Sequence, residues 1–265
     1  DESDPTPAKD RALFALITLV VAAVGYAAFL RILSYTTQPW YYILMLVFAA
    51  VCMETLFTSM PVKKWLWFAR CGFAIAFIGS ATFPAWQALQ VRQTNIDFIA
   101  RQLESLTKEG DLILISPWNY GITFRRTYHG EVPYITLPPV EDLRFHRCDI
   151  IKRQMMSPAP MEPVFQKMGE TLRAGKTIWL VGLLIPVAPG QRPMELPPGY
   201  DGPNGFVSGP FYHAWMEQAA FFVQTHALAV ENVPRASTQQ PIMHYEAPAV
   251  VSIRGWRPDA ALLTP

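Results

Sequence analysis

The sequence predicts a membrane-anchored α/β protein, in which three transmembrane helices precede an extracytoplasmic α/β domain with a mostly parallel sheet. Only 16% of the 265 residues are charged, whereas soluble domains carry about 25%. Long apolar runs are confined to the first third of the chain, and short apolar runs alternate with amphipathic segments after it. The expected parts are a cytoplasmic tail at 1–10, a transmembrane region at 11–89, the α/β domain at 90–258 and a C-terminal tail at 259–265.

Three apolar runs, at residues 12–33, 39–59 and 65–89, have the length of membrane-spanning helices. A helix rises about 1.5 Å per residue, so about 20 residues cross the hydrocarbon layer of about 30 Å. The region that these runs cover contains a single acidic residue, Glu54. The first run exceeds the roughly 7–15 apolar residues of a signal peptide and follows an acidic flank, which favours an anchor.

The basic residues near these runs predict their orientation. Lys9 and Arg11 precede the first run, and Lys63 and Lys64 lie between the second and the third. Cytoplasmic loops are enriched in Lys and Arg, so the N-terminus and the second loop are expected in the cytoplasm. Three spans then place the α/β domain outside, on the extracytoplasmic side of the membrane.

The remainder of the chain has the pattern of a small α/β domain. Apolar residues recur at helical spacing from Ile96 to Leu106, and continuous apolar runs such as 112–115 indicate buried strands. Alternation of helices and strands favours a mostly parallel sheet covered on both faces. The expected helices lie between Asn95 and Gly110, within 117–130, and at 147–156, 164–173 and 211–226, and the expected strands lie at 111–116, 133–137, 177–184, 227–233 and 242–253.

Composition and motifs exclude several classes of function. The 22 basic and 21 acidic residues nearly balance, so no nucleic-acid partner is expected. The cysteines Cys52, Cys71 and Cys148 are odd in number and widely spaced, and no histidine pair has zinc spacing. No nucleotide-binding glycine motif or nucleophile elbow occurs. We therefore expect no metal and no cofactor, and we assign no catalytic residue.

The first candidate binding cluster directly follows the predicted strand at 111–116. It contains Trp118 and Tyr120, and ligands of α/β sheets gather at the carboxyl ends of strands. These aromatic rings are suited to stacking on a sugar or to resting on lipid headgroups. The alternative is that they cap the hydrophobic core.

Two further clusters are basic. Arg125 and Arg126 are suited to phosphate, which a guanidinium group binds through two hydrogen bonds, or they form a solvated helix face. The third cluster could bind an anionic headgroup or transfer protons, and its alternative is an internal Arg–Asp pair that holds the loop. Its members are Arg144, His146, Arg147 and Asp149.

Several segments resemble the C-terminal part of bacterial membrane glycosyltransferases of the GT-C class, which are related to the dolichyl-phosphate-mannose protein mannosyltransferases. The resemblance implies a large helical bundle, a polyprenyl-phosphate sugar as donor, transfer at the outer membrane face and a C-terminal α/β domain. The segments that carry it are Gln38-Pro39-Trp40-Tyr41-Tyr42, residues 92–97, residues 110–121, Leu137-Pro138-Pro139, His146-Arg147-Cys148-Asp149 and Ile178-Trp179-Leu180-Val181-Gly182.

The chain departs from that family at the catalytic group. The resemblance implies a catalytic carboxylate in the first extracytoplasmic loop, but the corresponding loop here, 34–38, contains no Asp or Glu. We therefore expect a C-terminal portion or a subunit of such an enzyme that is not catalytic alone, with the bilayer, other membrane chains and a polyprenyl-phosphate sugar as partners. The alternatives are a non-catalytic accessory subunit that docks its helices onto a larger membrane complex, and a self-sufficient enzyme.

Overall fold

A computed structural model of the chain describes residues 6–33, 42–58, 64–199, 207–234 and 240–258. The chain forms two compact units, a helical unit up to Gln87 and a second unit that begins at Ala88. The expected C-terminal tail, the loop 34–38 with the start of the second apolar run, and Lys63 lie outside the described residues.

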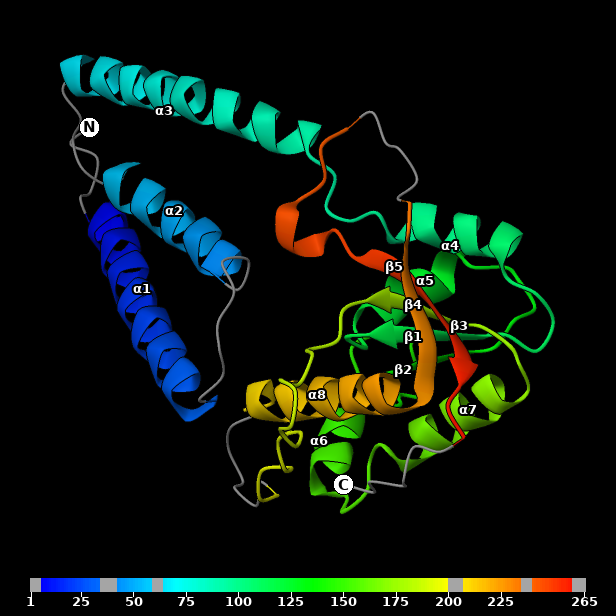
Figure 1. Cartoon of the computed structure of the whole chain (residues 1–265). Helices are drawn as coiled ribbons and strands as arrows, with labels where there is room; N and C mark the ends of the chain where they lie inside the picture. The colour runs from blue at the N-terminus through cyan, green and yellow to red at the C-terminus, as the bar shows by residue number, and fades with distance from the viewer. Residues whose placement is uncertain (1–5, 34–41, 59–63, 200–206, 235–239, 259–265) are drawn as a thin grey trace. The chain divides into compact units, whose positions relative to one another are not determined.

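The helical unit contains α1 (Thr6–Leu33), α2 (Ile43–Thr58) and all but the last three residues of α3 (Lys64–Gln90) (Figure 1). These helices match the three apolar runs. Two stretches of 24 residues, Lys9–Ile32 and Trp67–Gln90, are long and apolar enough to cross a membrane, a property that signal sequences and buried core helices share. The 16 residues of α2 extend over about 24 Å, which is less than the hydrocarbon layer.

The second unit contains a five-stranded mixed sheet in the order β2-β1-β3-β5-β4. The first three strands in this order pair in parallel, and β5 pairs antiparallel with both β3 and β4. The strands are β1 (Leu112–Ser116), β2 (Tyr134–Thr136), β3 (Ile178–Gly182), β4 (Ala227–Val233) and β5 (Ala249–Trp256).

The expectation of a mostly parallel sheet is therefore wrong for half of the strand pairs. Before β4, a helix returns the chain to the end of the sheet at which the parallel strands begin. β4 therefore runs in the same direction as β3. Between β4 and β5, the described residues contain the short 3₁₀ helix η2 (His244–Glu246) and no α-helical crossover. β5 therefore begins at the end of the sheet where β4 finishes. It enters the sheet between β3 and β4 and runs antiparallel to both.

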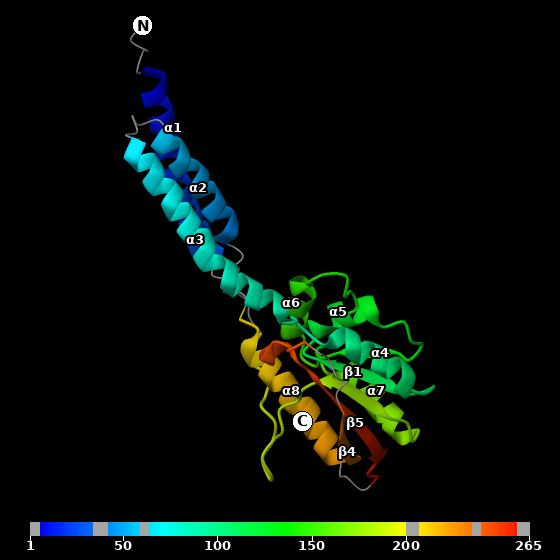
Figure 2. The ribbon, with the colours of Figure 1, turned by 90° about the horizontal axis from the view of Figure 1, so that it is seen from above.

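Helices cover both faces of the sheet (Figure 2). The buried side chains of α4 (Ile96–Leu106) and α5 (Tyr120–Thr127) pack with Ile113 and Ile115 of β1. On the other face, α7 (Glu162–Arg173) contacts β1, β3 and β5, and α8 (Gly209–His226) contacts β4 and β5. All five residues of β1 are buried, as a central parallel strand requires.

The C-terminal strand differs most from its predicted position. The apolar run at 242–253 predicts one strand, but the structure places η2 at its start and begins β5 only at Ala249. Pro248 has no amide hydrogen to give to a sheet, and its carbonyl instead accepts a hydrogen bond from the Asn95 side chain at 3.3 Å. By contrast, β4 has its predicted bounds, and α6 (Cys148–Met156) begins one residue after its predicted start.

Candidate functional site

The parallel strands end together at one edge of the sheet, which we call the carboxyl edge. Ser116 at the end of β1 is level with Gly182 at the end of β3, and Thr136 at the end of β2 is level with Ile115. The chain leaves β1 toward β2 but leaves β3 in the opposite direction, toward β5 and β4. Such a divergence is the position at which open α/β sheets bind ligands.

Trp118 joins three segments at this edge. Its indole Nε1–H donates a hydrogen bond to the Tyr212 hydroxyl in the first turn of α8, at 2.5 Å. The His146 ring, from the loop after β2, packs against the Trp118 ring with its centroid 5.5 Å away. Trp118 is only 4% exposed, so its ring caps the core and does not present a face for stacking on a ligand.

Tyr120 is also buried, at the start of α5, and lies close to a carboxyl group. Burial raises the pKa of the Tyr120 hydroxyl, and the negative charge of Glu246 raises it further. Burial also raises the pKa of Glu246, which belongs to η2. Tyr212 and Glu246 are not among the predicted site residues, because the partner of Tyr212 is 94 residues away in the sequence and Glu246 lies within a predicted strand.

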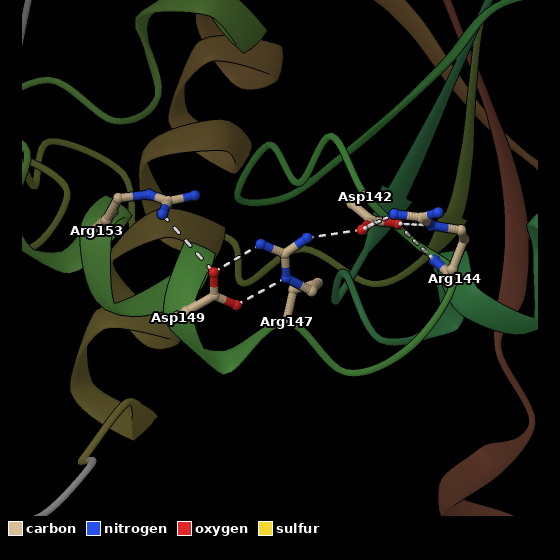
Figure 3. Close-up of polar contacts among 5 residues, drawn as sticks. All are labelled: Asp142, Arg144, Arg147, Asp149 and Arg153. Carbon is tan, nitrogen blue, oxygen red and sulfur yellow. Dashed lines mark hydrogen bonds and ion pairs between the residues drawn. The ribbon is translucent and has the colours of Figure 1, made fainter.

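A chain of ion pairs lies in the loop between β2 and α6 and in the first turns of α6 (Figure 3). Asp142 binds Arg144 at 2.9 Å and Arg147 at 2.6 Å. Arg147 also binds Asp149 at 2.7 Å, and Asp149 lies 3.7 Å from Arg153. Three guanidinium groups and two carboxylates leave this cluster with one excess positive charge.

These contacts fix the charge state of the cluster. Hydrogen bonds from Arg144 hold the pKa of Asp142 well below its usual range, and those from Arg147 lower the pKa of Asp149 to about 2. The same carboxylates raise the pKa of both arginines. An Asp149 that remains ionised at neutral pH is a poor proton donor, so the geometry disfavours proton transfer by this cluster. The Arg–Asp pairs hold the loop, and the exposed guanidinium groups of Arg144 and Arg153 remain accessible to an anion.

The structure does not bring the two basic clusters together. The crossover helix α5 runs from the carboxyl edge, where β1 ends, toward the opposite edge, where β2 begins. Arg125 and Arg126 are in its last turn, so they lie away from Arg144 and Arg147. Both are exposed and have no hydrogen bond or ion pair with another described residue, and their charge suits the negative end of the helix dipole.

A cleft of about 900 Å³ lies on the other face of the domain, between the start of α7, the loop 190–196 and α8. Apolar side chains such as Phe165 and Phe221 line it. The loop is tied to α8, because Glu217 accepts a hydrogen bond from the Met194 amide and Gln218 donates one to the Met194 carbonyl. Within the described residues, no three His, Cys, Asp or Glu side chains gather as metal ligands would.

No protein-family model, no curated protein and no solved structure matches this chain. The class of this protein is therefore described by its fold and its candidate site alone. It is a chain with exposed apolar helices in one unit and a mixed α/β sheet in the other, and an arginine-containing ion-pair cluster at the carboxyl edge of that sheet.

Proposed function

We propose that this chain is a membrane-anchored component of a polyprenyl-phosphate-sugar-dependent glycosyltransferase, and that it does not catalyse transfer alone. The observation that carries the proposal is the ion-pair cluster of Asp142, Arg144, Arg147, Asp149 and Arg153, which has an excess positive charge and lies where α/β sheets bind ligands. A lipid-linked phosphate is the anion expected beside a bilayer.

The exposed surface of the apolar helices supports the membrane anchor. In the 18-residue apolar window of each long stretch, only 6% and 0% of the residues are buried, unlike in the core helix of a soluble protein. Contiguous apolar surface of this extent requires lipid or another protein to cover it. We propose three spans in a bacterial inner membrane, with a cytoplasmic N-terminus and a periplasmic α/β domain.

Two arginines of the cluster have the capacity to bind a phosphate. The Arg144 and Arg153 side chains are 64% and 70% exposed, so each keeps guanidinium N–H groups toward solvent. A guanidinium group binds a phosphate through two parallel hydrogen bonds. The two carboxylates are already bound to arginines, so neither is suited to deprotonating an acceptor, and we assign the catalytic base to another segment or chain.

Binding of a polyprenyl phosphate to the full chain in lipid nanodiscs tests the proposal. We expect the double substitution Arg144→Ala and Arg153→Ala to weaken binding about tenfold, with Arg192→Ala as a matched control on the cleft. Unchanged binding in the double variant would refute the phosphate site. Sugar transfer by the purified chain alone would refute the non-catalytic role.

A second candidate function is an accessory subunit that docks its helices onto a larger membrane complex. Gly72, Ala76 and Gly79 share one face of α3, and a Cβ at either glycine would meet no atom within 4 Å. Small residues let helices approach closely in a membrane. We expect Gly72→Leu with Gly79→Leu to abolish recovery of a stoichiometric complex in mild detergent, whereas Gly25→Leu, in equally open space on α1, preserves it.

A further inference from the structure

The two outer strands of the sheet, β2 and β4, are protected to different degrees against pairing with another strand. The β2 edge has only three residues, and a short edge strand is one of the devices by which proteins prevent unwanted pairing. The β4 edge has seven residues, Ala227-Leu228-Ala229-Val230-Glu231-Asn232-Val233, without Pro, Lys or Arg. Within the described residues, β4 has β5 as its single strand neighbour.

Apolar side chains are exposed along this unprotected edge. Leu228 is 62% exposed and Val230 is 56% exposed. Residues two apart in a strand point to the same face, so these side chains lie next to each other. The charge of Glu231 does not shield them, because Glu231 alternates to the opposite face and forms an ion pair with Arg254 of β5.

We propose that a second copy of this chain pairs with β4 in antiparallel orientation, so that two five-stranded sheets form one continuous sheet. In the symmetric register centred on Ala229, Leu228 of each copy lies opposite Val230 of the other. This register brings all four exposed apolar side chains into cross-strand contact with one another. It also places Glu231 opposite Ala227, whereas a register centred on Glu231 would oppose two like charges and a register centred on Val230 would oppose Leu228 to Asn232.

The full chain in mild detergent tests this proposal by cross-linking. With Cys52, Cys71 and Cys148 replaced by Ser, we expect Ala229→Cys to form a covalent dimer on mild oxidation. Directly opposed Cα atoms in an antiparallel pair are about 4.5–5.5 Å apart, within the range that a disulfide spans. Neither Leu228→Cys nor Val230→Cys should cross-link efficiently alone, but the two mixed together should.

The mass of the detergent-solubilised protein supplies an independent test. We expect Leu228→Lys with Val230→Lys to convert the dimer to a folded monomer by light scattering, while Leu183→Lys, at another exposed apolar position, remains dimeric. A monomeric native protein would overturn the proposal. A dimer that survives the β4 substitutions and does not cross-link through Ala229→Cys would also overturn it, because its contact would then lie elsewhere, for example between the apolar helices. Neither result bears on the phosphate site.

Discussion

Trp118 shows how one buried polar atom determines the arrangement of three segments. Its indole N–H would be unpaired in the core without the Tyr212 hydroxyl, and an unpaired buried donor costs about 1–3 kcal/mol. We expect Tyr212→Phe to lower the free energy of unfolding by an amount in this range, measured by chemical denaturation. Tyr134→Phe is the matched control, because the Tyr134 hydroxyl has no hydrogen bond to another described residue. Equal effects of the two substitutions would contradict this role of Tyr212.

The ion pair between Arg147 and Asp149 predicts a specific pH dependence. The pKa of Asp149 falls from its usual 3.8 to about 2 in the folded protein, so this carboxylate contributes stability above about pH 4. That contribution is lost as the pH falls through the folded value of about 2. We expect a carboxyl NMR titration to give a midpoint near 2 for Asp149, and we expect Arg147→Gln to raise this midpoint toward 3.8. A midpoint that Arg147→Gln leaves unchanged would show that the pair does not form in solution.

Among the secondary-structure elements, the end of β3 depends on a residue without a side chain. Gly182 has a φ of 114°, and a Cβ there would lie 1.7 Å from the Ser116 carbonyl oxygen. We expect Gly182→Ala to destabilise the domain by more than about 3 kcal/mol, because backbone strain and a clash with β1 add together. Gly190→Ala measures the backbone strain without the clash, because Gly190 also has a positive φ but has open space around it. This substitution should lower the stability by only about 1 kcal/mol. Thermal unfolding of both variants measures the difference, and similar losses would show that the close approach to β1 is not essential.

The same elements show which parts of the fold are predictable from the sequence. β1 lies within a residue of its predicted position, because it is a short run, apolar from 112 to 115, that ends before Pro117. β4 also has its predicted bounds, although it contains Glu231 and Asn232 and follows α8 directly. The insertion of β5 between β3 and β4 was not predictable, because local patterning does not specify the neighbours of a strand. For the same reason the pattern leaves a ligand and a cap on the core as alternatives for Trp118, and it does not predict the contacts of its ring with Tyr212 and His146.

The native cysteines test the arrangement of the whole molecule in the cell. Cys148 is exposed in the α/β domain, whereas Cys52 and Cys71 belong to α2 and α3. With a periplasmic domain and membrane-embedded helices, a membrane-impermeant maleimide should label Cys148 in intact spheroplasts and should leave the other two unlabelled. The variant Cys148→Ser is the control and should lose the label. Labelling of Cys148 only after lysis would place the domain in the cytoplasm and contradict the proposed topology.

The position of β5 also has a consequence for how the polypeptide assembles during synthesis. β4 leaves the ribosome before β5, but its described strand neighbour is β5, and it has no direct pairing with β3. The nascent domain therefore holds a three-stranded parallel piece and an isolated β4 until residues 249–256 emerge. The fifth described strand joins the two pieces, so translation through residue 256 precedes closure of this five-stranded sheet.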